Sequence, residues 1–394
     1  MIISKKSVIL ILISVVLTNI MGMAFYSYLA RYLIFLKADK ITTQVIVTLF
    51  PLTSFIFPPL IGNLSDKYQK RTLLIIIGSL SLPLIFVFMH FIDNVILIVV
   101  FIFIYGFFLA FININFVLYQ ELVANDQSYI SYFNSGIVLG WFIGAQLCGI
   151  FIDNFGIVNL FVFLFIFSVP NFIVILFLKE DRKKILDNYT NSVKSENEEE
   201  EIKLNEERKP RYKSIYFALF FRNYGIRPIM SILTILMAFH LSLDSEIGFL
   251  IGVNPLIQFF LMILMGKIIS EYNLKSFMVI GYLLSGLTIL GYIISTDFWH
   301  FFLFQVLVSF SYSMFWTSTH MYIAKNTTPV NKGKYIGYAN SSFYLGSFVG
   351  GIFFSSLLVI NPNYYISMIP LIIFPVISAL IILFRFKNRN RDNN

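Results

Sequence analysis

The amino-acid sequence predicts an all-α polytopic membrane protein with twelve transmembrane helices in two six-helix halves. Three observations lead to this fold class. Hydrophobic residues make up 58% of the 394 residues, charged residues only 13%, and the mean hydropathy is +0.79. Apolar runs of the ~20 residues that a helix needs to cross a bilayer recur along the chain. A charged segment and an internal repeat divide these runs six and six. A soluble globule is excluded, because so few charged residues cannot cover such an apolar chain in water.

The first six apolar runs each end at charged residues, Pro, Gly or Asn. They cover residues 8–36, 43–64, 72–91, 95–119, 129–152 and 157–178. The first run follows Lys5 and Lys6, as in a signal peptide, but it is far longer than the apolar region of a signal peptide. We therefore expect a retained helix, and residues 1–178 are predicted to form an N-terminal six-helix bundle.

A charged segment at residues 179–213 separates these runs from six more. It holds ten Lys or Arg and ten Asp or Glu among 35 residues. Such a segment cannot bury enough apolar surface to fold alone, so we interpret it as a solvated cytoplasmic linker, with a regulatory role as the alternative. The later runs cover residues 214–241, 246–266, 276–296, 299–323, 335–358 and 365–384. Residues 214–394 are predicted to form a C-terminal six-helix bundle.

The positions of Lys and Arg predict the orientation in the membrane. With the N-terminus inside, the cytoplasmic segments hold 24 of the 29 Lys and Arg, whereas the outer loops hold only Lys37 and Lys40. The other three, Arg31, Arg222 and Arg227, fall within predicted helices. Because cytoplasmic loops carry the excess of positive charge, we expect a multi-pass protein of the cell membrane with both termini in the cytoplasm.

The two halves carry an internal repeat. Residues 129–144 and 335–350 align without a gap and are identical at nine of sixteen positions. The identities include Tyr, Asn and Gly, which a general excess of apolar residues does not align in one register. The segments that begin at Gly62 and Gly266 repeat at nearly the same offset. Since each half has an even number of spans, both halves begin and end on the same side, as in a parallel repeat.

The segment between the second and third spans, GNLSDKYQKRTLL, combines Gly, Asp and several basic residues. It resembles the signature that the major facilitator superfamily carries between its helices 2 and 3, except that Gln69 stands where the family usually has Gly. The resemblance implies the major facilitator fold. It also implies that Gly62, Asp66, Lys67 and Arg71 latch the two halves together at the inner face. Ordinary topogenic charge is the alternative.

The second half carries a weaker copy of this segment. Ser270 and Glu271 replace the Asp and its basic neighbour, so a weaker latch is expected there. The helix 4 and helix 5 motifs of proton-coupled carriers and drug antiporters have no counterpart. A set of spaced glycines instead predicts close helix packing in the fifth and eleventh spans, with a hinge as the alternative. These glycines are Gly136, Gly140, Gly144, Gly346 and Gly350.

Polar residues inside the predicted spans are the candidates for a substrate cavity, because such residues are expensive in lipid and usually face water or each other. Packing between helices is the alternative for each. Asn254 precedes Pro255, whose missing amide favours a kink beside a cavity. The neutral candidates are Asn19, Tyr26, Asn113, Asn134, Trp141, Asn254, Gln258, Tyr312, Trp316, Asn340 and Tyr344.

The three intrahelical arginines are expected at different depths. Arg227, which precedes Pro228, is placed about eight residues or ~12 Å inside its helix and is the preferred charged candidate for the cavity. Arg31 lies near the outer end of the first span, so it either lines the cavity or extends to the outer surface. Arg222 is expected to reach the inner membrane interface.

The titratable residues bear on solute charge and coupling. His320 is a candidate proton relay, because His titrates near neutral pH; a bond to a neighbour is the alternative. No Asp or Glu lies clearly inside a predicted span, and Glu121 comes just after the fourth. Arginines without a carboxylate favour a neutral polar or anionic solute over an organic cation, and uniport over proton coupling.

These observations favour a secondary transporter that moves a small solute by alternating access and acts as a monomer. The alternatives are a transport-dead sensor or scaffold on the same fold, and proton-coupled efflux of drugs or sugars. The four His are scattered and no hydrolase, metalloprotease or nucleotide-binding motif is present, so no enzyme activity, metal or cofactor is expected. Cys148 is the only cysteine, which excludes an intramolecular disulfide. Basic clusters beside apolar runs indicate contact with lipid headgroups and not with nucleic acid.

Overall fold

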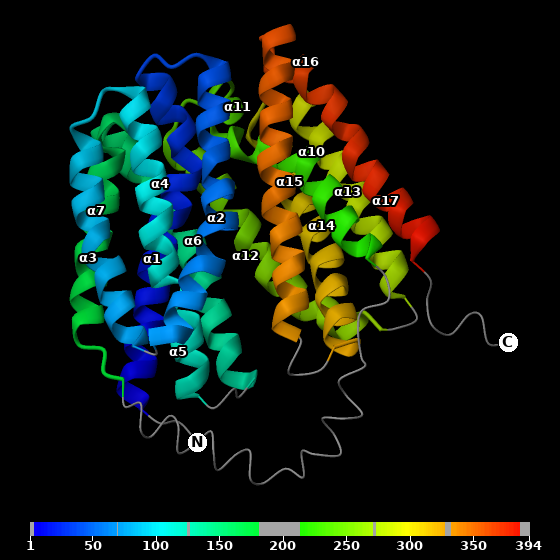
Figure 1. Ribbon diagram of the computed structural model, residues 1–394. Coiled ribbons are helices and arrows are strands. Elements are labelled where there is room, and N and C mark those ends of the chain that lie inside the picture. The colour runs from blue at the N-terminus through cyan, green and yellow to red at the C-terminus, as the bar shows by residue number, and fades with distance from the viewer. Residues whose placement is uncertain are drawn as a thin grey trace, which may run out of the picture.

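The computed structural model describes residues 4–68, 70–123, 127–180, 213–270, 273–327 and 332–386. These residues form two helical bundles that stand side by side, one built from α1 to α7 and the other from α10 onward (Figure 1). We use the upper and lower ends of Figure 1 as a frame of reference. The loop between α1 and α2 lies at the upper end, and α2 ends at the lower end.

The helices follow the predicted order of spans. The first bundle consists of α1 (Lys5–Phe35), α2 (Lys40–Tyr68), α3 (Arg71–His90), α4 (Val95–Ile112), α5 (Asn115–Leu122), α6 (Gln127–Phe155) and α7 (Leu160–Leu176). The second consists of α10 (Ser214–Ser231), α11 (Leu233–Ala238), α12 (Asp244–Ile268), α13 (Leu274–Ile294), α14 (Phe298–Lys325), α15 (Lys332–Ile360), α16 (Tyr364–Met368) and α17 (Ile373–Arg385).

Eleven helical segments of the described chain are long and apolar enough to cross a membrane, with α4 and α5 forming one of them. The predicted span at 214–241 supplies the twelfth element. It is helical, but it breaks at Ile232 between α10 and α11, and it carries Arg222 and Arg227. It packs against α15 and α17 inside the second bundle. The predicted all-helical membrane fold is confirmed.

Two other predicted spans are interrupted. The run at 95–119 divides into α4 and α5 at Asn113 and Ile114. The run at 365–384 begins as α16, passes through a 3-10 turn at Ile369–Ile372 and continues as α17. Pro370 accounts for the second interruption, because proline has no amide hydrogen for an α-helical bond. Most of the predicted linker at 179–213 lies outside the described residues.

Within each bundle, glycines bring one pair of helices into close contact, and the two pairs are equivalent in the repeat. A Cβ atom at Gly140 of α6 would collide with the backbone of Val16 on α1. A Cβ atom at Gly346 of α15 would collide with the backbone of Phe220 on α10. The glycine four residues further along each helix makes the same kind of contact. The repeated glycines therefore serve helix packing, and they do so at matching positions of the two repeats.

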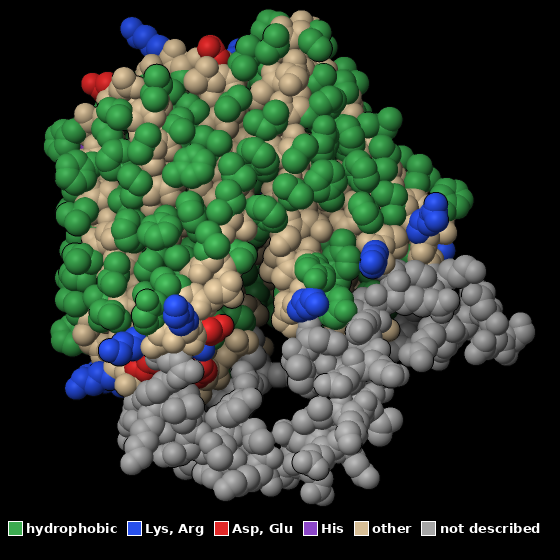
Figure 2. All heavy atoms as spheres, in the orientation of Figure 1, with side chains coloured by type: hydrophobic (Ala, Val, Ile, Leu, Met, Phe, Trp, Pro, Cys, Tyr) green, Lys and Arg blue, Asp and Glu red, His purple; other side chains and the backbone are tan. Residues whose placement is uncertain are grey.

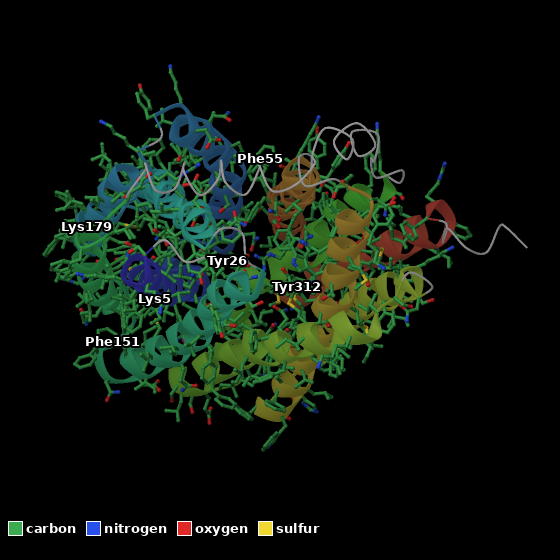
Figure 3. The ribbon with its side chains drawn as sticks, turned by 90° about the horizontal axis from the view of Figure 1, so that it is seen from below. Lys5, Tyr26, Phe55, Phe151, Lys179 and Tyr312 are labelled. Atoms are coloured by element: carbon green, nitrogen blue, oxygen red, sulfur yellow. The ribbon has the colours of Figure 1, made fainter. Side chains whose placement is uncertain are left out.

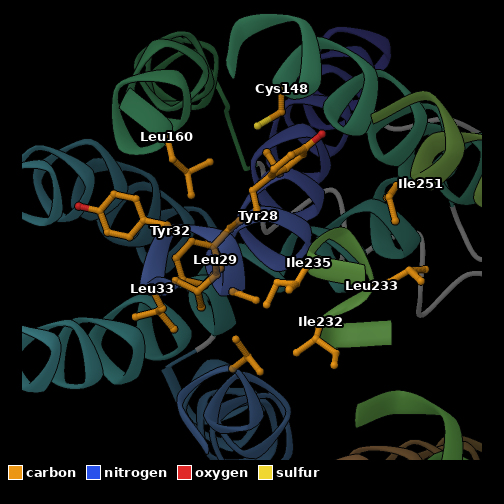
Figure 4. Packing of buried hydrophobic residues seen from close by; sticks show 14 of the residues in the cluster. Tyr28, Leu29, Tyr32, Leu33, Cys148, Leu160, Ile232, Leu233, Ile235 and Ile251 are labelled. Atoms are coloured by element: carbon orange, nitrogen blue, oxygen red, sulfur yellow. The ribbon is translucent and has the colours of Figure 1, made fainter. Parts of the chain in front are cut away.

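The hydrophobic core is shared between the bundles at one end only. The largest cluster of buried residues draws on both bundles and includes Tyr28 from α1 and Leu233 from α11 (Figure 4). Two further clusters each belong to a single bundle, one around Leu118 and the other around Met278. The shared cluster holds the upper ends of the helices, whereas the separate clusters lie towards the lower end.

Two pairs of helices form the seams between the bundles, α6 with α12 and α2 with α15. Gly149 and Gly248 let α6 and α12 approach so closely that a Cβ at either position would collide with backbone atoms of the other helix. At Gly351 of α15, a Cβ would collide with the side chain of Thr48 on α2. Below these seams the molecule is hollowed between the bundles (Figure 2).

Candidate functional site

Arg227 lies between aromatic rings from the two bundles. Its guanidinium carbon is 5.2 Å from the ring centre of Tyr26 on α1 and 5.0 Å from that of Phe343 on α15. The side chain is half-buried, and its Nε is buried without a hydrogen-bond partner. Within the described part of the chain, Arg227 forms no ion pair. The structure thus brings together two of the predicted cavity residues, Arg227 and Tyr26.

A ladder of rings on α14 runs from this point towards the lower end. Tyr312 stacks on Trp316 with ring centres 5.5 Å apart, and Trp316 contacts His320 at 4.5 Å. Trp316 also meets Phe343 edge-on at 5.7 Å. These residues recur every fourth position, so they occupy one face of the helix. Seen from below, Tyr26 and Tyr312 come from opposite bundles and lie near the centre of the molecule (Figure 3).

Phe343 links further predicted residues to Arg227. Its ring centre is 5.5 Å from that of Tyr344 and 5.7 Å from that of Trp316, on which Tyr312 stacks. Four residues predicted for the cavity from α10, α14 and α15 are therefore joined through Phe343: Arg227, Tyr312, Trp316 and Tyr344. We call these residues, together with Tyr26 and Phe343, the central site.

The expected position of Arg222 was wrong. This side chain does not reach the membrane interface but is 3% exposed inside the second bundle. Its Nε donates to Ser285 Oγ at 3.0 Å and its Nη1 to Asn223 Oδ1 at 3.0 Å, and its guanidinium lies 4.5 Å from the Phe315 ring centre. The side chain points into the bundle because α13 and α14 supply hydroxyl and aromatic partners there. No carboxylate among the described residues pairs with it.

An amide cluster lies between α12 and α14. Asn254 donates to Gln305 Oε1 at 3.0 Å and accepts from Gln258 Nε2 at 3.3 Å. Ser309 donates to the carbonyl oxygen of Asn254 at 3.0 Å. Sequence reasoning missed Gln305, which is fully buried and whose Nε2 has no partner. Gln305 lies seven residues before Tyr312 and therefore on the same face of the helix, and this spacing could have identified it from the sequence.

In the part of the chain that the structure describes, several other predicted residues make no hydrogen bond or ring contact with the central site. Asn19 donates to Val15 O of its own helix at 2.8 Å. Trp141 is half-buried on α6. The structure exposes Asn113, Asn134 and Asn340. Their role in solute binding stays a prediction.

The polar residue that is buried near Asn113 is Asn115, which the sequence reasoning did not single out. Its Nδ2 donates to Ser14 Oγ at 3.1 Å, and Ser14 in turn donates to Asn171 Oδ1 at 2.7 Å. These residues come from α1, α5 and α7, and all are buried. These hydrogen bonds join three helices inside the first bundle. Intramembrane amides commonly have this packing role.

Arg31 lies at the upper end, away from Arg227, and forms an ion pair with Asp244 at the start of α12. Both side chains are largely covered, at 22% and 14% exposure. Asp153 of α6 accepts from the backbone amides of Asp244 and Ser245 at 2.6 and 2.8 Å. Tyr28 donates to Asp244 O at 3.1 Å. We call Tyr28, Arg31, Asp153 and Asp244 the upper lock, because they join the two bundles.

Two more hydrogen bonds close the upper end. Thr234 of α11 donates to Ser27 O at 2.6 Å, and Lys40 donates to Pro362 O at 2.9 Å. The upper side is therefore held shut by polar contacts as well as by the shared core.

The predicted inner-face latch is organised around Arg71 within the first bundle. Arg71 makes a bidentate pair with Glu121, at 3.0 and 2.8 Å, and also bonds Ser65 Oγ at 3.1 Å. Its Nη2 lies 3.3 Å from Asp66 Oδ1, and Asp66 is 71% exposed. Lys67 lies over the ring of its neighbour Tyr68 at 5.9 Å. Gly62 has open space where a Cβ would stand.

We expect Asp66→Ala to reduce solute flux strongly while leaving membrane insertion and folding intact. The carboxylate is exposed, so its pair with Arg71 contributes at most about 1 kcal/mol to folding. Flux in proteoliposomes and the melting temperature in detergent measure the two effects separately. Asp93→Ala, an exposed carboxylate at the upper end, is the matched control. Unchanged flux in Asp66→Ala would show that the charged segment between α2 and α3 only directs the membrane topology.

Two bundles joined along two seams around a polar centre define a transporter-type fold. The sequence matches the family model described as MFS_1 like family over residues 20–360, and the chain belongs to this family. The resemblance to the major facilitator superfamily is confirmed. None of the curated proteins matches the sequence.

Solved transporter structures share the fold at low sequence identity. A mutant of the nucleoside transporter NupG has a TM-score of 0.77 and 11% identity, over 97% of this chain and 100% of that chain. A mutant of the peptide transporter POT in complex with sulfate has a TM-score of 0.75 and 12% identity, over 96% and 94%. A bacterial homolog of the human lysosomal transporter Spinster, inward-facing and unoccupied, has a TM-score of 0.71 and 12% identity, over 96% and 97%.

Proposed function

We propose that the protein is a secondary transporter that moves a small neutral polar or anionic solute across the cell membrane by alternating access. The observation that carries the proposal is the central site, where Arg227 touches rings of both bundles. A solute bound there contacts both bundles, so its binding free energy depends on the angle between them. The nucleosides and peptides named for the similar structures are small polar solutes, which supports this class.

The lower end is proposed to face the cytoplasm. Lys and Arg gather along the lower edge of the visible face (Figure 2). Since positive charge accumulates on the cytoplasmic side, this arrangement supports the orientation predicted above. The shared core and the upper lock then close the outer side, and the hollow opens to the cytoplasm. We interpret the conformation as inward-open, with both termini in the cytoplasm.

The charge of the central site supports selection against organic cations. Arg227 and Arg222 lie on one helix within electrostatic reach of each other, and no described carboxylate pairs with either. In a low-dielectric cavity these arginines repel a cationic solute, whereas an anion or a neutral hydrogen-bond acceptor accepts hydrogen bonds from the Arg227 guanidinium. Asp66 and its basic neighbours are proposed to bias the cycle at the inner face, and His320 remains a candidate relay.

We expect the reconstituted protein to exchange at least one neutral or anionic solute and to exclude lipophilic cations. The assay is counterflow in proteoliposomes with uridine, glucose, dialanine, succinate and tetraphenylphosphonium. Arg227→Gln is expected to weaken anion transport about tenfold or more, because a charge-assisted hydrogen bond is lost. Arg385→Gln, an exposed arginine at the end of α17, is the control.

Robust counterflow of tetraphenylphosphonium by the unmodified protein would contradict the proposed charge selection. Absence of flux for a wide solute panel, from protein that is folded and inserted, would favour the sensor or scaffold alternative.

A further inference from the structure

We infer that the central site binds an organic anion that carries a planar aromatic group. This inference rests on the proposed transporter function and names the class of solute. Two features of the site point to it: a guanidinium without a counter-ion among the described residues, and a ladder of rings that begins beside it. Each feature selects a different part of the solute.

The guanidinium selects the anionic part. The guanidinium of Arg227 lies over the rings of Tyr26 and Phe343, which come from opposite bundles. Among the described residues, its buried Nε has no hydrogen-bond partner. A buried donor without an acceptor is destabilising, and a carboxylate can accept two parallel bonds from a guanidinium. A neutral carbonyl would satisfy fewer donors and leave the charge uncompensated.

Arg222 strengthens this preference from behind the ring ladder. Its guanidinium carbon lies 5.8 Å from the Tyr312 ring centre, and its Nε and Nη1 donate to Ser285 and Asn223. Because the side chain is buried, Arg222 adds positive potential to the site from inside the second bundle. In the described spans, no carboxylate near these two arginines cancels that potential.

The ladder selects the aromatic part. Trp316 lies between Tyr312, which stacks on it, and His320, whose ring is tilted by 52° against it, so α14 presents a row of aromatic rings beside the site. Aromatic rings attract another ring in offset-stacked or edge-to-face contacts. Phe343 already makes an edge-to-face contact with Trp316. A planar solute ring gains such contacts here, whereas a saturated ring gains only apolar contact.

The position of the ring ladder along α14 indicates the path by which a solute reaches the central site. The helix α14 runs from the upper end to the lower end, so Trp316 and His320 lie one and two turns below Tyr312. A solute that enters the hollow from the lower side meets these rings before it reaches Arg227. The aromatic group is therefore expected to lie below the anionic group in the bound solute.

The test compares four matched probes that separate charge from aromaticity: benzoate, benzamide, cyclohexanecarboxylate and benzylamine. Binding to detergent-purified protein is followed by the rise in melting temperature with probe concentration. Benzoate is expected to bind about tenfold or more tightly than benzamide, which lacks the charge-assisted bond. It is expected to bind about threefold to tenfold more tightly than cyclohexanecarboxylate, which lacks the ring face. Benzylamine is expected not to bind.

Variants assign each preference to its residue. Arg227→Gln is expected to abolish the preference for benzoate over benzamide, while Arg227→Lys retains part of it and guards against a folding defect. Trp316→Leu is expected to abolish the preference for benzoate over cyclohexanecarboxylate. Trp299→Leu, an exposed tryptophan at the upper end of the same helix, is the control and keeps both preferences.

Equal binding of benzoate and benzamide, or a benzoate preference that survives Arg227→Gln in folded protein, would overturn the inference. Exchange of uridine or glucose together with no binding of benzoate would overturn it as well, yet leave the proposed transporter function standing. A protein that exchanges none of a wide solute panel would instead count against the proposed function.

Discussion

Arg31→Gln is expected to shift the protein from its inward-open state towards an outward-open one. The substitution removes the ion pair with Asp244 that joins α1 to α12, and it leaves only the bonds that the backbone of Asp244 makes with Asp153 and Tyr28. For a largely covered pair, we expect a loss of about 1–3 kcal/mol in the closed upper end, which changes the ratio of the two states by about fivefold to over a hundredfold. Flux is expected to fall, because one state becomes overpopulated.

The single cysteine provides the measurement. Cys148 is fully buried and lies beside Tyr28 of the upper lock (Figure 4). Opening of the upper end withdraws α12 from this region, so a membrane-impermeant thiol reagent added from outside is expected to label Cys148 about tenfold faster in Arg31→Gln. Cys148→Ser, which leaves no thiol, sets the background.

Lys37→Gln is the matched control, because this exposed residue lies in the loop that follows α1 and, among the described residues, makes no hydrogen bond or ion pair with the second bundle. Asp244→Asn removes the other partner of the ion pair and is expected to reproduce the effect of Arg31→Gln. Labelling that stays as slow as in the unmodified protein, in variants that have lost flux, would show that the pair does not hold the upper end closed.

Arg71→Ala is expected to destabilise the first bundle, in contrast to Asp66→Ala. Arg71 is 6% exposed and ties the ends of α2 and α5 to the start of α3 through Ser65, Asp66 and Glu121. Its removal breaks a bidentate buried pair and leaves Glu121 without its guanidinium partner, which costs about 2–4 kcal/mol. The melting temperature and the yield of monodisperse protein in detergent measure this loss.

Arg71→Lys tests whether charge alone is sufficient. A lysine keeps the charge but cannot form the planar fork, so partial recovery of stability is expected. Arg385→Ala, at an exposed helix end, is expected to leave the melting temperature unchanged. If Arg71→Ala melts like the unmodified protein, then the cluster around Arg71 does not stabilise the fold.

Much of the architecture could be predicted because its signals lie along the chain. The apolar runs marked the spans, and they correspond closely to the helices of the structure. The glycines at Gly140 and Gly346 were predicted to pack helices closely, and they do. The break at Ile232 was not predicted, because the pattern of residues there stays apolar through the interruption.

The candidate site was predicted only in part. Intrahelical polar residues could be found as expensive groups in lipid, which identified Arg227, Tyr26 and Tyr312. The same rule also proposed Asn134 and Asn340, which the structure exposes. It missed Gln305, a fully buried amide bonded to a predicted residue.

The sequence by itself determined that the solvent of this protein is a lipid bilayer, that apolar helices cross it many times and that the halves repeat. These properties are read from hydropathy and identity along the chain. Only the tertiary structure decided which polar groups meet. Arg31 with Asp244 and Arg227 with Tyr26 pair across the two bundles, from segments about two hundred residues apart. Helices that cross a bilayer are apolar both towards the lipid and towards each other. The sequence therefore has no polar stripe that indicates which face of each helix turns inward.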